Sequence, residues 1–287
     1  MTPTPIASRT RVWFVTGAAR GIGLRIVEAA LAIGDAVVAT SRDVASLRER
    51  FAGNDALLPV ALDVTDERQA AAAVAAALDR FGRIDVLVNN AGFGLLGAVE
   101  EASAAEVRRL YETNVFGLLN VTRAALPAMR ERRRGHVVNI SSVGGYRSGA
   151  GFGVYCSTKF AVEGISEALH AELAPLGVHV TVVEPGYFRT EFLDQSSLTV
   201  SPRILADYAA TSGQVRERAV QINQKQPGDP KRLAQAMLTL VASPTPPLRL
   251  PLGTDTLQAI ADKNADVANE TAAWRELSAS TDFPAGE

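Results

Sequence analysis

The sequence predicts a doubly wound α/β fold, a three-layer sandwich with a central parallel sheet of about seven strands. Three observations support this prediction. Short apolar runs alternate along the chain with longer segments of helical periodicity, which is typical of a parallel sheet covered on both sides. A glycine-rich turn joins the first apolar run to the first helical segment. The 287 residues contain no internal repeat, linker or second core, so we expect a single domain.

Composition and charge exclude several classes of protein. Apolar residues make up 47% of the chain, which is ample for a sizeable core. The net charge of −2 argues against a nucleic-acid surface, and the single cysteine, Cys156, excludes an internal disulfide. Neither a signal peptide nor a run of about 18 apolar residues is present, so we expect a cytoplasmic protein without a membrane partner.

The first strand is expected over residues 12–15, after a frayed lead-in at residues 1–10. It runs into Thr16-Gly17-Ala18-Ala19-Arg20-Gly21-Ile22-Gly23, where a helical pattern begins. Glycines permit so tight a turn, and they let backbone N–H groups touch a pyrophosphate that no Cβ shields. The helix points its positive end at the same place. The turn therefore predicts a dinucleotide site, although a glycine-rich turn alone is often only a tight connection.

The second strand, expected over residues 36–40, is followed by Ser41 and Arg42. In a dinucleotide fold the residue that closes this strand meets the adenosine ribose, where a carboxylate would accept the 2′-hydroxyl of NAD and repel a 2′-phosphate. A guanidinium instead grips a phosphate, and Arg20 could approach the same group from the turn. The sequence therefore favours NADP(H). NAD(H) stays open because Asp43 offers a carboxylate one residue later.

Polar and small residues follow the next two strands. The third strand, over residues 57–62, ends at Asp63-Val64, and locally Asp63 fits equally well as a helix cap. The fourth strand, over residues 84–88, ends at Asn89-Asn90-Ala91-Gly92. Small and amide residues at the carboxyl end of a strand suit the crevice in which ligands lie in open α/β sheets.

The remaining elements follow from the same alternation. We expect helices over residues 66–81, 103–131, 155–173, 231–242 and 254–277, and strands over residues 136–140, 178–183 and 249–250. Between residues 187 and 229 the pattern loosens to short helical pieces at 202–208 and 214–223 without a strand. Such a long irregular stretch in a compact domain is typical of a lid. Residues 254–287 form the expected C-terminal helical extension.

Two helices carry polar side chains that helix formation does not explain. Asn114 lies on an apolar stripe, and a buried amide must be hydrogen-bonded, so we expect it to cap backbone groups or to hold a water. Tyr155 and Lys159 are four residues apart, which places a phenol and an ammonium on one helix face. A neighbouring positive charge lowers the pKa of a tyrosine toward the working range of a proton donor. By itself, however, such a pair is common and usually reflects packing.

Taken in order, the motifs resemble the classical short-chain dehydrogenase/reductase family over almost the whole chain. The resemblance implies a Rossmann-type oxidoreductase domain over residues 11–287, with a substrate lid at residues 187–229 and a bound nicotinamide cofactor. The motifs that carry the resemblance are Thr-Gly-x-x-x-Gly-x-Gly at residues 16–23, Asn-Asn-Ala-Gly at residues 89–92, Asn114, Ser142, Tyr155-x-x-x-Lys159, Pro185-Gly186 and Thr190.

The resemblance also implies roles for four side chains. Tyr155 would protonate the carbonyl oxygen in reduction and act as the base in oxidation. Lys159 would lower the pKa of Tyr155 and bind the ribose hydroxyls next to the nicotinamide. Ser142 would hydrogen-bond the substrate oxygen and stabilise the developing alkoxide. Asn114 would hold a water that connects Lys159 to solvent.

The expected cofactor contacts come from the glycine turn, the strand ends and the segment after the sixth strand. By resemblance, Thr190 would touch the nicotinamide carboxamide. The three histidines have no metal spacing, so no metal is expected. The full set of expected cofactor-binding residues is Gly17, Arg20, Gly21, Ile22, Gly23, Ser41, Arg42, Asp63, Val64, Asn90, Ala91, Gly92, Tyr155, Lys159, Pro185, Gly186 and Thr190.

The residues expected around the substrate are mostly apolar, which favours an apolar ketone or aldehyde and its alcohol over a small charged metabolite. We therefore expect an NADP(H)-dependent carbonyl reductase. Two alternatives stay open: an NAD(H)-preferring alcohol dehydrogenase on the same site, and a non-catalytic protein that senses NADP(H). The expected pocket residues are Leu95, Val143, Tyr146, Tyr187, Phe188 and Phe192.

Finally, the resemblance implies a homo-oligomer. The long helices over residues 103–131 and 155–173 would pair with their copies in a second subunit. The C-terminal extension from residue 254 onward would obstruct the further contact that makes tetramers, so a homodimer is favoured.

Overall fold

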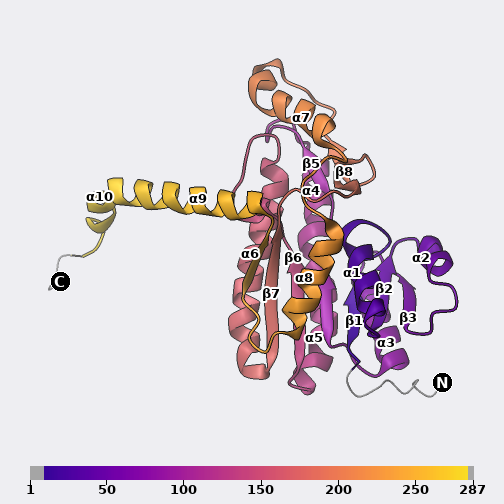
Figure 1. Ribbon diagram of the computed structural model, residues 1–287. Coiled ribbons are helices and arrows are strands. Elements are labelled where there is room, and N and C mark those ends of the chain that lie inside the picture. The colour runs from indigo at the N-terminus through magenta and orange to yellow at the C-terminus, as the bar shows by residue number, and fades with distance from the viewer. Residues whose placement is uncertain (1–9, 284–287) are drawn as a thin grey trace.

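A seven-stranded parallel sheet forms the centre of the molecule, in the order β3-β2-β1-β4-β6-β7-β9. The computed structural model describes residues 10–283, so the lead-in expected at residues 1–10 lies, except for Thr10, outside the described residues. Helices cover both faces of the sheet (Figure 1). The doubly wound three-layer fold predicted from the sequence is therefore confirmed.

Most strands and helices lie within a few residues of their expected positions, but helix α2 was not expected. The strands of the sheet are β1 (Val12–Val15), β2 (Ala36–Ser41), β3 (Leu57–Ala61), β4 (Val86–Asn89), β6 (Gly135–Ile140), β7 (Val178–Pro185) and β9 (Arg249–Leu252). The helices are α1 (Gly21–Ala32), α2 (Ala45–Arg50), α3 (Glu67–Phe81), α4 (Ala104–Tyr111), α5 (Gly117–Glu131), α6 (Gly153–Leu173), α7 (Gln214–Ile222), α8 (Pro230–Ala242), α9 (Thr254–Ala273) and α10 (Arg275–Ala279).

Two hydrophobic cores lie on opposite faces of the sheet, because side chains alternate along each strand. In β1, Trp13 and Val15 pack with residues of α1 and α8, whereas Val12 and Phe14 pack with residues of α3 and α5. All four side chains are fully buried. A strand that is buried on both faces is a continuous apolar run, which is why this strand stands out in the sequence.

The helix expected over residues 103–131 contains a wider turn near its middle. Ser103 and Glu106 form a capping box at the start of α4. A π-helical turn, Glu112–Phe116, then joins α4 to α5 and contains Asn114. Single π turns inside α-helices are frequent at functional sites. The backbone at Asn114 therefore indicates a functional position, in addition to the evidence from its side chain.

The segment expected to form a lid contains a strand that the sequence did not predict. β8 (Leu198–Val200) pairs in parallel with β5 (Gly94–Leu96) and forms a separate two-stranded sheet. The expectation of no strand between residues 187 and 229 is therefore wrong. A three-residue strand is too short to show a periodic pattern, and it forms here because a partner strand lies beside it.

Helix α9 leaves the body of the protein as a long arm that ends in α10 (Figure 1). Its first turns contact the body, where Asn264 accepts a hydrogen bond from the Tyr146 hydroxyl at 2.6 Å. The helix expected over residues 254–277 is interrupted at Trp274, and Leu257 on its expected apolar side is 55% exposed. Among the helices that the structure describes, none is long and apolar enough to cross a membrane.

Candidate active site

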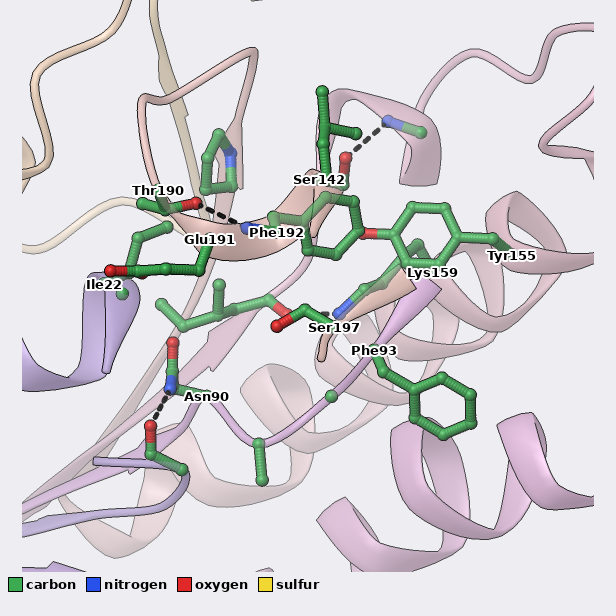
Figure 2. A pocket seen from close by; sticks show the side chains of 18 of the residues that line it. Ile22, Asn90, Phe93, Ser142, Tyr155, Lys159, Thr190, Glu191, Phe192 and Ser197 are labelled. Carbon is green, nitrogen blue, oxygen red and sulfur yellow. Dashed lines mark hydrogen bonds between the residues drawn. The ribbon is translucent and has the colours of Figure 1, made fainter. Parts of the chain in front are cut away.

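A cavity of about 1520 Å³ opens along the carboxyl ends of the sheet strands. Its lining runs from Gly17 and Arg42, after β1 and β2, to Tyr155 on α6 and Tyr187 beyond β7. This is the edge at which ligands lie in open α/β sheets. Most of the residues expected to bind cofactor or substrate line this one cavity, and Figure 2 shows the part of it around Tyr155.

The glycine turn and the Asn-Asn-Ala-Gly segment are hydrogen-bonded to each other at one end of the cavity. The Thr16 hydroxyl accepts the N–H groups of Asn90 and Ala91 at 2.9 and 3.0 Å. The Asn90 amide donates to the Thr16 and Gly17 carbonyls. Gly17 has a φ of +63°, and a Cβ on Gly23 would lie 2.5 Å from the Gly17 oxygen. Both positions therefore require glycine, and the turn is held in place by the protein itself.

The N-terminus of α1 faces this end of the cavity without a side-chain cap. Its N-cap residue, Arg20, makes no side-chain hydrogen bond to the first turn, and that turn holds no acidic residue. The N–H groups that begin a helix need acceptors, and phosphate oxygens suit them well. Gly21 and Ile22 line the cavity beside these groups. The turn therefore fits the pyrophosphate of a dinucleotide cofactor.

Ser41, Arg42 and Asp43 line the cavity at the end of β2. The Asp43 carboxylate accepts the Ala45 N–H at 2.8 Å, at the start of α2. Within residues 10–283, the exposed Arg42 guanidinium has no hydrogen-bond or ion-pair partner. The carboxylate at this position is thus engaged in a local turn, and a guanidinium is available to an anion.

Two other expected cofactor residues make additional contacts. The Arg20 guanidinium donates to the Ser196 carbonyl at 2.6 Å, which links the glycine turn to the segment expected to form the lid. The Asp63 carboxylate accepts hydrogen bonds from the N–H and hydroxyl groups of Thr65 at 3.0 and 2.8 Å. Asp63 and its neighbour Val64 also line the cavity. Asp63 therefore stabilises a local turn and faces the cavity at the same time.

Ser142, Tyr155 and Lys159 meet toward the other end, around the part of the cavity seen in Figure 2. Tyr155 is 8% exposed and Lys159 is 7% exposed. The Ser142 hydroxyl accepts the Gly144 N–H at 3.0 Å and lies close enough to the Tyr155 phenol to act on its pKa. The Lys159 ammonium donates to the Ile140 carbonyl at 2.9 Å and lies 5.8 Å from the centroid of the Tyr155 ring.

Burial dominates the electrostatics of these groups. It raises the pKa of Tyr155 above the ordinary value, and the neighbouring Ser142 hydroxyl opposes this only in part. It also lowers the pKa of Lys159 to about 8, against the field of Glu163. The expected lowering of the pKa of Tyr155 is therefore not observed. The reason is that the Lys159 ammonium is turned to a carbonyl and the phenol is buried, so Tyr155 is protonated at neutral pH.

Asn114 is 2% exposed and lies behind the cavity wall. Its amide oxygen accepts the Phe93 N–H at 3.1 Å. Its amide nitrogen donates to the Phe93 carbonyl at 3.0 Å and to the Thr158 hydroxyl at 3.2 Å. The amide therefore caps backbone groups, the first of the two expected alternatives. One lone pair of the amide oxygen remains for a further donor such as a water.

Pro185, Gly186 and Thr190 line the cavity beyond β7. Position 186 is a glycine because α9 comes close: a Cβ there would lie 2.3 Å from the Asp255 carboxylate. Asp255 also accepts the Tyr187 N–H at 2.7 Å. The Thr190 hydroxyl accepts a backbone N–H two residues on, an interaction marked in Figure 2. The first turn of α9 is thus part of the site, which the sequence did not predict.

The apolar wall surrounds the Tyr155 ring, and the Phe192 ring lies 5.6 Å from it, centroid to centroid. Two expected pocket residues do not line the cavity. Leu95 belongs to β5 and is buried in a hydrophobic cluster, and Tyr146 is turned to Asn264 on α9. The expected pocket residues that do line it are Val143, Tyr187, Phe188 and Phe192.

Several lining residues were missed from the sequence. Phe93 follows the Asn-Asn-Ala-Gly segment directly, and Phe152 precedes α6, so both could have been found from their distance to a motif. Arg218 and Gln226 come from the irregular segment after β7, and Asp255 comes from α9. No local pattern marks these three, because only the tertiary fold brings their segments to the cavity.

Known proteins share this sequence pattern. The short chain dehydrogenase family matches residues 11–200. The protein named Oxidoreductase BOA17 of Botryotinia fuckeliana is 40% identical, over 94% of this chain and 98% of its own. The 3-ketodihydrosphingosine reductase of Bacteroides thetaiotaomicron is 37% identical, over 85% of this chain and 88% of its own.

Solved structures share the fold. A short-chain dehydrogenase from Streptomyces avermitilis has a TM-score of 0.89 and 44% identity, covering 96% of this chain and 100% of its own. A short chain dehydrogenase/reductase from Burkholderia phymatum in complex with NAD has a TM-score of 0.80 and 25% identity, covering 91% of this chain and 95% of its own. A serine dehydrogenase complexed with NADP+ has a TM-score of 0.72 and 30% identity, covering 84% of this chain and 94% of its own. Both nicotinamide cofactors thus occur among similar structures.

Proposed function

The chain belongs to the short-chain dehydrogenase family, and from this premise we propose that it interconverts an apolar ketone or aldehyde and its alcohol with NADP(H). It is an oxidoreductase that acts with a nicotinamide cofactor. The observation that most supports the finer proposal is the buried phenol of Tyr155, which lies beside Ser142 and an apolar wall at one end of an elongated cavity.

Tyr155 is the proposed acid of the reduction. Because burial raises the pKa of Tyr155, its hydroxyl carries a proton at neutral pH and can give it to a carbonyl oxygen as that oxygen gains negative charge. The Ser142 oxygen already accepts the Gly144 N–H, so its own proton remains to stabilise the same substrate oxygen. The bound cofactor supplies the hydride, and in oxidation Tyr155 takes the proton back.

Lys159 and Asn114 are proposed to complete the proton path. The Lys159 ammonium would bind the ribose hydroxyls of the cofactor, and its positive charge would favour the phenolate that Tyr155 becomes after proton transfer. The free lone pair of the Asn114 amide oxygen would hold a water that returns a proton from solvent to Lys159. The π turn fixes Asn114 in the required place behind the cavity.

The preference for NADP(H) is proposed from the end of β2. Arg42 is exposed on the cavity wall and unpartnered among the residues described, whereas Asp43 is engaged by the Ala45 N–H. A 2′-phosphate would therefore meet a guanidinium at this end. Arg42→Ala should weaken NADPH binding at least about tenfold, about 1.4 kcal/mol, and leave NADH binding nearly unchanged in fluorescence titrations. Equal losses would place Arg42 away from the phosphate.

The proposed substrate is an apolar carbonyl compound or alcohol. The wall near Tyr155 is built from aromatic and aliphatic side chains, and residues 187–229 would close over it as a lid. A relative named 3-ketodihydrosphingosine reductase supports a lipid-like ketone as the first compound to test.

The proposal is tested by Tyr155→Phe, which removes the proton donor and little volume. Turnover of the best ketone or aldehyde from a screen with NADPH should fall about a hundredfold to ten-thousandfold. Nicotinamide fluorescence should show that the cofactor still binds, which separates loss of chemistry from loss of folding. Tyr111→Phe makes the same change at a phenol on α4 that does not line the cavity, so it is the matched control and should retain turnover. Unchanged turnover in the Tyr155 variant would refute the assignment.

A homodimer is proposed as the assembled state. Phe116 beside α5 and Phe160 on α6 are 48% and 44% exposed, and such side chains on the two long helices support pairing with a second copy. Light scattering of the purified protein should give twice the chain mass of 30.4 kDa. The mass of a single chain would contradict the proposal.

A further inference from the structure

Two buried glutamates lie beneath the proposed catalytic residues and have no part in the mechanism above. Glu163 follows Lys159 by one turn of α6, and Glu184 precedes Pro185 at the end of β7. The side chain of Glu184 is 0% exposed, and that of Glu163 is 8% exposed. Glutamates are almost never buried so completely unless they are paired. Burial of two glutamates therefore requires a partner that neutralises or protonates them.

One guanidinium serves both carboxyl groups. Arg249, on β9, places its Nε 3.3 Å from a Glu163 oxygen and 3.5 Å from a Glu184 oxygen. An outer nitrogen of the same guanidinium contacts Glu167, which is 55% exposed. Among the described residues, the four carboxyl oxygens of Glu163 and Glu184 have no hydrogen-bond partner, and the two groups act on each other electrostatically. A single cation thus faces three carboxyl groups, two of them buried and interacting with each other.

Two carboxyl groups in contact cannot both be ionised without a large electrostatic penalty, and a shared proton is the usual solution. Burial and the neighbouring Glu163 raise the pKa of Glu184 to about 7, and burial raises the pKa of Glu163 as well. A proton shared by a Glu163 oxygen and a Glu184 oxygen would form a hydrogen bond between two groups that otherwise only accept. The pair then keeps one negative charge, opposite the Arg249 guanidinium.

The pair is close to the groups that perform the proposed chemistry. A Cβ on Gly145, in the loop after Ser142, would lie 3.0 Å from Glu163 Oε1 and 2.4 Å from the Ser141 hydroxyl oxygen. The charge of Glu163 raises the pKa of Lys159, against the burial that lowers it to about 8. Glu163, and not Glu184, is the carboxyl group whose charge shifts the pKa of Lys159.

We propose that Glu163 and Glu184 hold a single proton between them, and that the one negative charge they keep maintains the ammonium form of Lys159. This inference rests on the proposed function, in which Lys159 acts as a cation. Glu163 and Glu184 are positioning residues, because neither is among the described residues that line the cavity. The charged and titratable groups that face the pair are Arg249 from β9, Glu167 and Lys159 from α6, with the Ser141 hydroxyl at the end of β6.

Below about pH 7, where the pair holds its proton, two matched substitutions move the negative charge without changing its amount. Glu163→Gln leaves one carboxylate on Glu184, farther from Lys159, and Glu184→Gln leaves one carboxylate on Glu163, one helical turn from it. Each replaces a carboxyl by an amide of the same shape and keeps Arg249. An opposite charge within about 4–6 Å shifts a pKa by about 1–3 units, so the location of this charge governs the lysine.

The expected result is a split between the two pH profiles of kcat/KM. Glu163→Gln should move the alkaline limb down by about one pH unit or more, which is a tenfold loss of activity above that limb. Glu184→Gln should leave the limb in place, because Glu163 keeps its charge at that pH. A purely structural role would move neither limb, or both alike, and either result would overturn the proposal.

A second measurement needs neither activity nor a folded variant. Infrared spectra of the wild-type protein in D2O should show the C=O band of a protonated carboxylic acid at about pH 6, where isolated carboxyl groups are ionised. The band should disappear as the pH rises through about 7. Its absence at about pH 6 would overturn the shared proton. If the band is present while Tyr155→Phe retains full turnover, the proposed function fails and the carboxyl pair stands.

Discussion

Glu101, beneath the lid segment, and Glu184, beneath the proposed catalytic residues, are both fully buried, and each faces an arginine. Glu101 accepts the Arg216 guanidinium through both oxygens, at 2.6 and 3.3 Å. It also accepts the N–H groups of Ala98 and Leu205 at 2.7 and 2.9 Å. Within the described part of the chain, the partners of Glu184 are the Arg249 Nε at 3.5 Å and the carboxyl group of Glu163.

The pKa values of these two glutamates move in opposite directions. The hydrogen bond from Arg216, with the two backbone donors, lowers the pKa of Glu101 to about 2. Burial and the like charge of Glu163 raise the pKa of Glu184 to about 7. Hydrogen-bond donors thus keep the Glu101 carboxyl group charged, whereas burial and a neighbouring carboxyl group oppose the ionisation of Glu184. Glu101 is ionised at neutral pH and binds α7 to the body through Arg216. Glu184 titrates near neutral pH.

Substitution of the arginine that faces each glutamate should have the largest effect on the unfolding temperature. Arg216→Met leaves the Glu101 carboxylate buried without its counter-ion, which is strongly destabilising. Its unfolding temperature should fall by about 5 °C or more, and the KM of the carbonyl substrate should rise as α7 loosens. Arg249→Met should lower the unfolding temperature less than half as much, because the Glu163–Glu184 pair can take up a second proton. Thermal unfolding followed by circular dichroism at pH 7 measures both.

Arg203→Met is the control for this comparison. Arg203 lies in the lid segment, and its ion pair with Glu100 is 3.9 Å long with both side chains 59% exposed. Pairs of this kind contribute little, so the unfolding temperature should hardly change. Equal losses in the Arg216 and Arg249 variants would contradict the difference drawn between the two glutamates.

The pH dependence of stability should separate the two sites more finely. The folded pKa of Glu184 lies above the ordinary value of 4.5, so its stabilising contribution is complete below about 4.5 and is lost as the pH rises through about 7. Glu184→Gln should therefore gain stability relative to wild type between these values. The folded pKa of Glu101 is lowered, so its contribution is present above about 4.5 and is lost as the pH falls through about 2. Denaturant unfolding of Glu184→Gln and Glu101→Gln from about pH 2 to 8 checks both windows, and parallel curves would be evidence against them.

The smallest effect is expected from Glu167→Gln. Glu167 contacts Arg249 from the surface and is 55% exposed, so its ion pair is screened by water. The free energy of unfolding should change by no more than about 1 kcal/mol, and the alkaline limb of the activity profile should stay where it is. A limb shift as large as that of Glu163→Gln would mean that the outer carboxylate, not the buried pair, sets the charge of Lys159.

The parts of the molecule that depend on neighbouring residues were predictable from the sequence. The turn from Thr16 to Gly23 has backbone angles and close contacts that only glycine satisfies. The spacing of its glycines can therefore be recognised in the sequence. Tyr155 and Lys159 share a helix face because they are four residues apart. The order of strands follows from buried apolar runs between helices.

The parts that depend on distant segments were not predictable. Asp255 reaches the site because α9 passes over Gly186, a contact between two segments that are far apart in the chain. The net pKa shift of Tyr155 depends on how deeply the fold buries the phenol, which spacing to Lys159 does not reveal. The ion pair between Glu101 and Arg216 links residues with no local relation. Each of these features exists only after the chain has folded.

The pairing of β5 with β8 has a consequence for synthesis on the ribosome. Gly94 pairs with Leu198, so β5 emerges about a hundred residues before its partner strand. At about 5–20 residues per second, this edge waits roughly 5–20 seconds without its hydrogen-bond partner. An unpaired apolar edge is an aggregation hazard, and a length of only three residues keeps this one small. The brevity of β5 thus protects the nascent chain until the second half of the protein arrives.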